Sequence, residues 1–474
     1  MAGAASWLIF PLSLSCLLLL TSSTTITIPI FHHSTKHSSS DHPVETLNYL
    51  AALSLRRALH LKSPARSSTN LSSNLVEDEK IPLFPRSYGG YSFSLSFGTP
   101  PQTTKMVMDT GSSLVWFPCT SRYRCSSCNF PNVTPILTFI PNLSSTSKLV
   151  GCKNPRCSML LGPSVLSNCK ETCDPPTSQN CTTSTCPPYI IQYGSGATSG
   201  LLLIETLHLP HNKTLPDFLV GCSILSIRQP EGIAGFGRSP ESLPSQLGAK
   251  KFSYCLVSHR FDDNPEASSD LVLETGSGSG GDAKTRGLSY TPFVKNPPNT
   301  FQDYYYVLLR KIVVGSKNVG IPYKFLAPGA DGNGGTIVDS GSTFTFMERA
   351  VYELVAKAFE DQMVNFTAAK EVENRTGLRP CFNISGAKED IFVPKLILHF
   401  KGGAKMSLPA ANYFSFLGGD VVCLTIVSNG VVGPGLSGGP SIILGNYQQQ
   451  NFQIEYDLEN HRFGFKQQIC SSAD

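Results

Sequence analysis

The chain has 474 residues, too long for one small domain and long enough for two sizeable hydrophobic cores. Charged residues make up 15% and aromatic residues 9%, with 40 Gly and 34 Pro. This balance indicates an ordered, turn-rich, mainly β protein rather than a disordered or helical one. The net charge of +4 is spread along the chain, which argues against a nucleic-acid-binding protein, since that needs a clustered basic surface.

The N-terminal segment has the composition of an export signal. An apolar run over residues 7–20 is followed by small and hydroxyl residues, and it is short for a membrane span of about 20 apolar residues. We therefore predict a signal peptide over residues 1–27. Because residues 470–474 are polar, we expect no stable membrane anchor.

Cysteine usage and glycosylation sequons agree with export. Of the 15 cysteines, Cys16 falls in the predicted signal peptide, and the remaining even number predicts disulfides formed in an oxidising compartment. Candidate N-glycosylation sites, each in an Asn-x-Ser/Thr sequon, are Asn132, Asn142, Asn180, Asn212, Asn365, Asn374 and Asn383.

Residues 28–87 are rich in Ser, His, Lys and Arg, and residues 45–61 form a Leu-rich stretch that predicts a helix containing Arg56 and Arg57. One interpretation is a solvated N-terminal arm. The other is a propeptide whose positive charge covers an acidic cleft and leaves it as the pH falls. We favour the propeptide because of the segment that follows.

Short strands with Gly/Pro turns begin after this segment and continue to the C-terminus. Residues 91–97 alternate apolar and polar side chains as a half-buried strand does, and helices are predicted near residues 242–247 and 349–363. The Gly/Ser run at 274–281 is interpreted as a surface loop, because the Lys-Ser/Thr and helix start of a phosphate-binding loop are missing.

An internal repeat divides this region. The segment at 105–113 is echoed at 335–343, and each copy is followed by an apolar-apolar-Gly element, at 232–237 and 443–446. The repeat predicts two β lobes, an N-terminal lobe over residues 88–288 and a C-terminal lobe over 289–474.

Asp109 and Asp339 occupy matching positions in the repeat, each at the end of an apolar strand and followed by hydroxyl and Gly residues. A single Asp-Thr-Gly could be an ordinary turn, but two copies predict a pair of buried carboxylates. Two such groups brought together cannot both ionise, so one retains a proton. The ionised carboxylate can deprotonate a water while the protonated one donates to a carbonyl oxygen.

These motifs resemble those of the pepsin family of aspartic proteases, and within it the plant nepenthesin-like branch. Asp109-Thr-Gly-Ser-Ser113 and Asp339-Ser-Gly-Ser-Thr343 match the two active-site motifs, and Tyr193-Gly-Ser-Gly-Ala-Thr-Ser-Gly200 matches the flap. The segments at 98–102, 116–119 and 443–450 look like the plant branch. The resemblance covers residue 88 to the C-terminus and implies an all-β, bilobal pepsin-like fold with a few short helices.

The resemblance also implies roles for particular residues. Tyr193 would be the flap tyrosine beside Gly194, with Trp116 as its hydrogen-bond partner. Thr110 and Ser340 would tie the two Asp loops together, and Gly111 and Gly341 would permit their tight turns. Ser112, with either Ser342 or Thr343, would bond the outer carboxylate oxygens. Disulfides would join Cys255 to Cys470 and Cys381 to Cys423.

A Cys-rich insertion lies between Cys119 and Cys186. Cys125-Ser-Ser-Cys128 alone would suggest zinc or a redox pair, but in an exported chain a disulfide is the better interpretation, and we predict no metal site. The His residues that follow residue 87 share no spacing typical of metal ligands or of a catalytic site.

The sequence therefore predicts a secreted aspartic endopeptidase that acts at acidic pH on peptide or protein substrates, without metal or organic cofactor. We expect a monomer in the apoplast or cell wall, with the vacuole as the alternative destination. The rival interpretation is a catalytically silent inhibitor or binding protein of the same fold, such as a xylanase inhibitor. Such proteins typically lose a catalytic Asp or its neighbours, and here both triplets are intact. A glycosidase also uses two carboxylates, but nothing beyond the carboxylates supports one.

Overall fold

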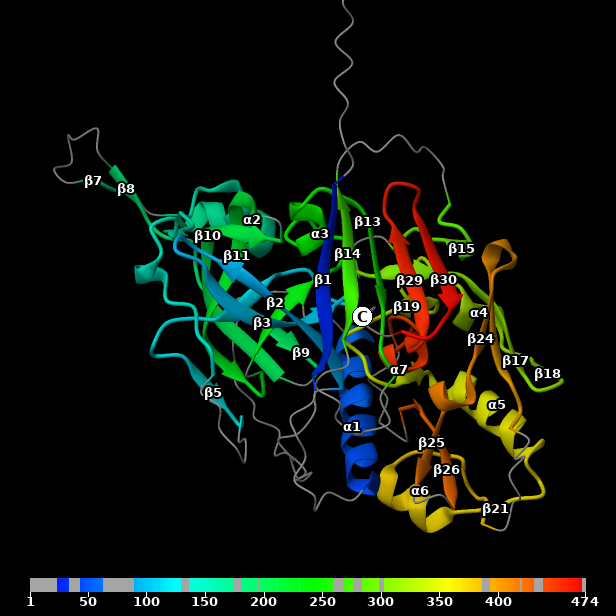
Figure 1. The fold of residues 1–474 in the computed structure, drawn as a ribbon. Helices are drawn as coiled ribbons and strands as arrows, with labels where there is room; N and C mark the ends of the chain where they lie inside the picture. Colours follow the sequence, from blue (N-terminus) through cyan, green and yellow to red (C-terminus); the bar gives the residue numbers. More distant parts are fainter. Residues whose placement is uncertain are drawn as a thin grey trace, which may run out of the picture.

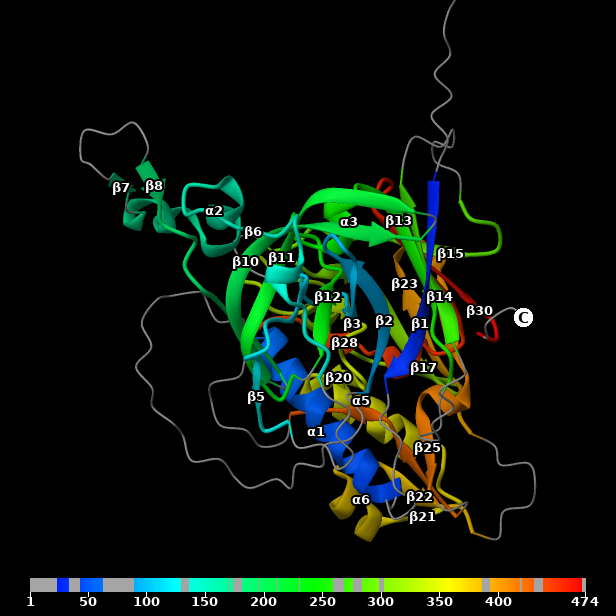
Figure 2. The same ribbon diagram turned by 60° about the vertical axis from the view of Figure 1, so that its left-hand side comes forward.

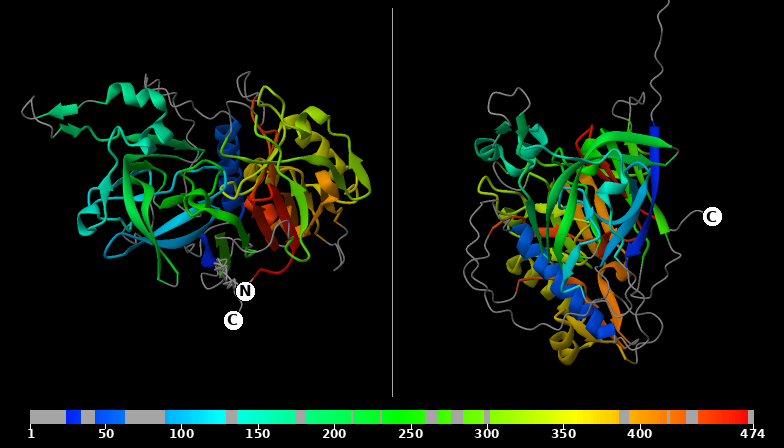
Figure 3. Two further views of the ribbon diagram at one scale, coloured as in Figure 1. Left: turned by 90° about the horizontal axis from the view of Figure 1, so that it is seen from above. Right: turned by 90° about the vertical axis from the view of Figure 1, so that its left-hand side faces the viewer.

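Two lobes lie side by side, and the blue helix α1 stands between them when the molecule is viewed from above (Figure 3). The computed structural model describes residues 24–33, 43–62, 89–128, 136–169, 171–173, 181–194, 196–210, 212–229, 231–258, 268–275, 284–297, 302–385, 393–417, 420–429 and 438–470. Most of the predicted signal peptide and much of the predicted propeptide therefore lie outside the described residues.

The N-terminal lobe is built on a long, mostly antiparallel sheet that continues through β14 and β13 to β29 and β30 from the C-terminal part of the chain (Figure 1). Its main path runs β15-β30-β29-β13-β14-β1-β2-β3-β12-β4-β11-β10-β6, with β5 and β9 paired beside it. The strands are β1 (Thr24–His33), β2 (Gly90–Phe97), β3 (Gln102–Asp109), β4 (Trp116–Pro118), β5 (Arg124–Ser126), β6 (Lys148–Leu149), β9 (Tyr189–Tyr193), β10 (Gly196–Leu209), β11 (Lys213–Ile227), β12 (Gly232–Gly235), β13 (Ala249–Cys255), β14 (Ser268–Thr275), β15 (Ser289–Pro292), β29 (Phe452–Asp457) and β30 (Arg462–Gln467).

The C-terminal lobe has three smaller sheets, ordered β16-β19-β28-β20-β27, β18-β17-β23-β24 and β21-β22-β26-β25. Their strands are β16 (Tyr305–Val307), β17 (Leu309–Val314), β18 (Lys317–Val319), β19 (Thr336–Val338), β20 (Thr345–Met347), β21 (Thr367–Ala368), β22 (Cys381–Asn383), β23 (Leu396–Phe400), β24 (Lys405–Leu408), β25 (Phe414–Leu417), β26 (Val421–Leu424), β27 (Ile426–Val427) and β28 (Ile442–Leu444). A separate pair, β7 (Glu171–Cys173) with β8 (Cys181–Thr183), projects from the Cys-rich insertion (Figure 1).

The alternation read from residues 91–97 corresponds to β2. Phe93, Leu95 and Phe97 are buried in the core while Ser94 is exposed. The strand pairs antiparallel with β3, which ends at Asp109. The core of this lobe thus fixes the strand that carries the first predicted catalytic carboxylate.

Helices are few, as the composition predicts. They are α1 (Pro43–Lys62), α2 (Pro155–Leu161), α3 (Leu243–Gln246), α4 (Tyr323–Leu326), α5 (Arg349–Glu360), α6 (Lys370–Thr376) and α7 (Asn446–Gln449), with 3₁₀ turns at η1 (Pro141–Leu143), η2 (Pro163–Asn168), η3 (Lys401–Gly403) and η4 (Ala410–Asn412). Ser242 caps α3 by accepting from the Ser245 N–H, and α5 buries most of the apolar face expected of residues 349–363, although Leu354 is exposed.

Helix α1 has the clearest consequence for function. It crosses the molecule beside β9 of the N-terminal lobe and β20 and α6 of the C-terminal lobe (Figure 2). One side of the helix is buried in a cluster with aromatic residues of the C-terminal lobe. This side carries Leu47, Leu50, Ala58 and Leu61, whose spacing along the chain places them on the same face of a helix. Residues 43–62 are therefore packed structure rather than a solvated arm.

Six disulfides connect described residues: Cys119–Cys222, Cys125–Cys128, Cys152–Cys169, Cys157–Cys186, Cys255–Cys470 and Cys381–Cys423. The last two are the pairs that the family resemblance implied. Cys125 and Cys128 bond each other, which agrees with the predicted disulfide.

Candidate active site

The two repeated Asp loops meet where the lobes join. Asp109 ends β3, which pairs in parallel with β12, and Asp339 follows β19, which pairs in parallel with β28. β12 lies within the first apolar-apolar-Gly element of the sequence repeat, and β28 ends just before the Gly of the second. The two halves therefore use the same local construction, and both carboxylates are buried.

Each carboxylate is held by the small residues that follow it. The Gly111 N–H donates to Oδ1 of Asp109 at 2.9 Å, and the Ser112 hydroxyl donates to Oδ2 at 2.6 Å. The second loop repeats these contacts around Asp339, with Gly341 at 2.9 Å and Ser342 at 2.6 Å. Donors around a buried carboxylate lower the cost of its negative charge.

Of the two alternatives for the second loop, Ser342 bonds the carboxylate. The Thr343 hydroxyl donates instead to the Gly89 carbonyl oxygen at 2.9 Å. Asn446 donates to the same Gly89 oxygen at 2.7 Å and to the Ser340 oxygen at 2.9 Å. Thr343 therefore anchors the start of the N-terminal lobe rather than the carboxylate.

Thr110 and Ser340 cross-link the loops beneath the carboxylates. The Thr110 N–H donates to Ser340 Oγ at 3.0 Å, and the Ser340 N–H donates to Thr110 Oγ1 at 2.9 Å. Each hydroxyl then donates across the interface, to Val338 O at 3.3 Å and Met108 O at 3.0 Å. This reciprocal arrangement fixes one lobe's carboxylate relative to the other's.

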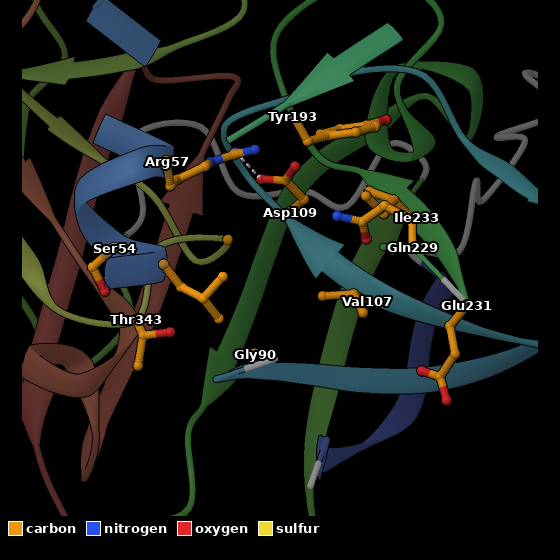
Figure 4. Close-up of a pocket in the computed structure, with 12 residues that line it drawn as sticks. Ser54, Arg57, Gly90, Val107, Asp109, Tyr193, Gln229, Glu231, Ile233 and Thr343 are labelled. Carbon is orange, nitrogen blue, oxygen red and sulfur yellow. Dashed lines mark hydrogen bonds and ion pairs between the residues drawn. The ribbon is translucent and has the colours of Figure 1, made fainter. Parts of the chain in front are cut away.

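The β9–β10 hairpin covers the site from the N-terminal lobe. Tyr193 ends β9, and its hydroxyl accepts a hydrogen bond from Trp116 Nε1 at 2.8 Å. Gly194 lies against helix α1, since a Cβ there would come within 2.1 Å of the Arg57 Cα atom. The flap tyrosine thus lies over Asp109, and the flap glycine packs against the backbone of α1 at Arg57 (Figure 4).

Arg57 of α1 bonds both carboxylates, although it is not among the site residues predicted from the sequence. Its Nη2 lies 2.6 Å from Asp109 Oδ1 and 3.3 Å from Asp339 Oδ1, while its Nε lies 3.1 Å from Asp339 Oδ2. Figure 4 shows the guanidinium pointing at Asp109 beneath Tyr193. The signal for this contact was the basic pair Arg56-Arg57 inside the predicted helix.

Burial and charge set the protonation of the three groups. Burial, together with the negative charge of Asp339, raises the pKa of Asp109 to about 6, against the lowering effect of Arg57. Burial also raises the pKa of Asp339, but the Arg57 ion pair and hydrogen bond hold it below its usual range. Burial alone would lower the pKa of Arg57, and the two carboxylates raise it instead. The carboxylates thus titrate as a coupled pair under a buried cation.

Helix α1 makes further polar contacts in the same cleft. The Ser54 hydroxyl accepts from the Phe344 N–H at 2.8 Å, and the Tyr304 hydroxyl donates to the Leu61 carbonyl oxygen at 3.3 Å.

A cavity of only about 50 Å³ remains beside Asp109 (Figure 4). It is lined by Leu53, Ser54, Arg57, Gly90, Val107, Asp109, Tyr193, Gln229, Glu231, Ile233, Gly341 and Thr343. Ligand pockets are usually several hundred Å³, so with α1 in place a peptide does not fit.

The other predicted residues lie away from this cleft. Asn142, Asn212, Asn365, Asn374 and Asn383 are all exposed, whereas Asn132 and Asn180 lie outside the described residues. Within the described ranges, no group of three or more His, Cys, Asp or Glu side chains could hold a metal ion. Nor does any described helix combine the length and apolar character needed to span a bilayer.

Comparison with known proteins places the chain in a family. Two family models, described as xylanase inhibitor N-terminal and xylanase inhibitor C-terminal, match residues 91–273 and 304–467. A probable aspartyl protease of Arabidopsis thaliana is 34% identical, covering 81% of this chain and 82% of that protein. The aspartic proteinase nepenthesin-2 of Nepenthes gracilis is 32% identical, covering 81% of this chain and 79% of that protein.

The fold is also that of solved structures. The crystal structure of edgp has a TM-score of 0.61 at 20% identity, covering 94% of this chain and 95% of that one. Basic 7S globulin from soybean has a TM-score of 0.57 at 18% identity, covering 95% and 96%. With the bilobal β fold, the duplicated Asp loops and these relatives, the chain belongs to the pepsin family of aspartic proteases, in its plant nepenthesin-like branch.

Proposed function

We propose that the protein is a secreted aspartic endopeptidase, made as a zymogen, that hydrolyses peptide bonds at acidic pH with Asp109 and Asp339. The observation that carries this proposal is the duplicated carboxylate cradle, in which each Asp keeps a Gly N–H and a Ser hydroxyl donor. The relatives named aspartyl protease and nepenthesin support the same activity.

The chemistry follows from two coupled carboxyl groups that share one proton. The ionised group takes a proton from a water as that water's oxygen attacks the scissile carbonyl carbon. The protonated group donates its proton to the carbonyl oxygen, and a tetrahedral diol forms. When the diol collapses, the carboxyl group that took the water proton passes it to the amide nitrogen, the carbon–nitrogen bond breaks, and the other carboxylate takes a proton back from a diol hydroxyl. Tyr193, bonded to Trp116, would close the flap over the peptide.

Helix α1 would be the inhibitory part of a propeptide over residues 28–87. Arg57 neutralises the carboxylates on which the chemistry depends, and α1 occupies the space that a peptide would need. Protonation of the carboxylates removes the charges that hold the guanidinium. Because Arg57 lowers the pKa of both carboxyl groups, protonating either of them opposes this contact, which therefore weakens as the pH falls. β1 pairs with β14 and β2, so departure of the whole segment would also remove a strand from the central sheet.

The decisive experiment is cleavage of a denatured protein substrate by the secreted, acid-incubated chain, with and without pepstatin, a general inhibitor of aspartic proteases. Asp109→Asn should lower the rate roughly a thousandfold or more, because the variant cannot supply the second carboxyl group. Asp361→Asn is a matched control, since Asp361 pairs with Lys317 and Lys357 on the surface. Cleavage that survives both pepstatin and Asp109→Asn would contradict the proposal.

The second candidate is a binding protein or inhibitor of another enzyme, and the descriptions of the matching family models favour it. Against it stand the complete carboxylate cradles and the reciprocal Thr110–Ser340 contacts. A folded chain freed of α1 that cleaves no substrate would favour this candidate. Its partner would then be sought among secreted hydrolases.

A further inference from the structure

The last residue of α1 places a cation in a second, separate site of the cleft. The Lys62 side chain is only 1% exposed, and its Nζ lies 3.3 Å from Glu348 Oε2 and 3.2 Å from the Pro440 carbonyl oxygen. The same ammonium lies 5.6 Å from the centre of the Phe346 ring. Burial lowers the pKa of Lys62, and the carboxylate of Glu348 opposes that shift. A buried ammonium needs such partners to offset its lost hydration.

The partners of Lys62 belong to the framework of the C-terminal lobe and not to α1. Phe346 lies in β20, and Glu348 follows β20 as the N-cap residue of α5. The Glu348 N–H donates to the Ser441 carbonyl oxygen at 2.7 Å, and the Ser441 hydroxyl donates to Glu348 Oε2 at 2.9 Å. The carboxylate is therefore oriented by its own lobe, independently of Lys62.

The neighbouring loop is shaped to accept a peptide backbone at this point. A Cβ on Gly439 would come within 2.7 Å of the Lys62 Cα atom. The Gly439 backbone is itself held, because its carbonyl oxygen accepts from the Gly334 N–H at 3.0 Å. Close approach of a chain to residues 438–441 thus depends on glycine at a fixed position.

The spacing along α1 relates this site to the carboxylate pair. Lys62 follows Arg57 by five residues, which is about 7.5 Å at about 1.5 Å per helical residue. An extended peptide advances about 3.3 Å per residue, so the same distance corresponds to two or three residues of substrate. A substrate side chain that reached Glu348 would therefore lie two or three residues from the scissile bond.

We infer that Glu348, the Phe346 ring and the Pro440 carbonyl form a subsite that takes a lysine or arginine side chain of the substrate once α1 has left. The inference rests on the proposed function. A carboxylate, a carbonyl oxygen and an aromatic face all attract a cation. Lys62 occupies the subsite in the zymogen as a substrate lysine would in the active enzyme.

The test uses the full chain after acid incubation and a series of fluorogenic peptides with one parent apolar sequence. Lysine is placed in turn two and three residues to each side of the cleaved bond, and each peptide is matched by one with norleucine there. At one of these positions, we expect kcat/KM to be about tenfold higher for lysine than for norleucine, because a hydrogen-bonded ion pair with a partly buried carboxylate is gained. Arginine peptides measure whether the guanidinium is taken as well.

Glu348→Gln should bring the lysine-to-norleucine ratio close to one, because the amide keeps the shape and an acceptor for Ser441 but loses the charge. Glu353→Gln is the matched control on the same helix, since Glu353 pairs with Arg349 and Arg379 at the surface and should leave the ratio as it is. A ratio near one in the unmodified protein, or an undiminished ratio in Glu348→Gln, would overturn the subsite while leaving the protease activity intact. Absence of cleavage of every peptide would overturn the proposed function and the subsite with it.

Discussion

Arg57 inserts one guanidinium between the two carboxylates that carry the proposed chemistry, and it is buried with them. A buried cation and the buried anions around it stabilise one another only while all of them remain charged. Loss of either charge leaves the other unpaired in a medium that solvates it poorly. The contact therefore determines whether the carboxylates are available to a substrate.

Replacing Arg57 with Gln should release the autoinhibition without acid. We expect the full chain carrying Arg57→Gln to cleave a fluorogenic peptide at pH 6.5 about tenfold faster than the unmodified chain, because three charge-assisted hydrogen bonds to the carboxylates are lost. The measurement is the initial rate before any acid exposure. Arg56→Gln makes the same chemical change one residue earlier and should leave the rate low. Equal rates for Arg57→Gln and the unmodified chain would show that α1 is held by its other contacts.

Tyr193 offers a second test at the level of a single side chain. Tyr193→Phe keeps the ring but removes the oxygen that accepts from Trp116, so the flap should close less precisely over the peptide. We expect kcat/KM of the acid-activated enzyme to fall about tenfold. Tyr189→Phe, at the other end of β9, is the matched control. A full rate for Tyr193→Phe would assign the tyrosine to packing alone.

The two carboxylates could be predicted from the residues alone because each lies within its own short motif, whereas the Thr110–Ser340 and Tyr193–Trp116 contacts were implied only by the family resemblance. Asp109 and Asp339 could be found because each is bonded by residues two and three positions later, so the whole cradle is a local pattern. Arg57 could not be assigned in the same way. It meets residues 52 and 282 positions away, and no local pattern specifies such a contact. The choice between Ser342 and Thr343 likewise depended on the distant Gly89 carbonyl.

Helix α1 is an element whose packing couples to pH. His60 is partly buried beside Arg57, and burial, followed by the charge of Arg57, lowers the pKa of His60 to about 4. In the released segment, the same imidazole would return to its ordinary value of about 6.5. The released state therefore binds more protons between these values. Docking of α1 is favoured above about pH 6.5 and becomes weaker as the pH falls through this window.

Replacing His60 with a residue that does not titrate should lower the pH at which α1 is released. In His60→Gln, we expect the midpoint of α1 release to move down by a few tenths of a pH unit to about one unit, since the carboxylate pair alone then drives release. The tryptophan fluorescence of a chain without residues 1–27 reports the event, because Trp7 is in the predicted signal peptide and Trp116 lies under the flap. His399→Gln on β23 is the control. An unchanged midpoint in His60→Gln would exclude His60 from the pH response.

Element types were largely predictable, whereas their partners were not. The helix over residues 45–61 and the strand over 91–97 follow from periodicity, because one side of each must be apolar to be buried. The periodicity does not indicate that α1 packs in the cleft or that β1 pairs with β14 and β2. Those choices depend on which surfaces remain uncovered once both lobes have formed.

At the scale of the whole molecule, the two lobes are joined by polar contacts as well as by the shared sheet. Asp303, at the start of the C-terminal lobe, accepts hydrogen bonds from the hydroxyls of Ser113 and Ser239 in the N-terminal lobe. Glu241 lies close by, and burial, with the charge of Asp303 adding to it, raises the pKa of Glu241 to about 7. Two carboxylates near one junction oppose each other when both are ionised.

Because the pKa of Glu241 is raised in the folded state, this group stabilises the fold more in acid than at neutral pH. A carboxyl group whose pKa is raised in the folded state contributes stability fully below its unfolded value of about 4.5 and loses that contribution as the pH rises through about 7. Glu241→Gln removes the charge at every pH. We therefore expect the variant to melt about 1–2 °C higher than the parent at pH 7.5, a modest figure because Glu241 is partly exposed. At pH 4.5 the two melting temperatures should coincide.

Both chains in this comparison should carry Asp109→Asn, so that self-cleavage does not obscure the melting transition at low pH. Glu353→Gln, in the surface pairs of α5, serves as the control and should show a difference from the parent that does not change with pH in this way. If the gap between Glu241→Gln and the parent were the same at pH 7.5 and pH 4.5, protonation of Glu241 would not contribute to acid stability.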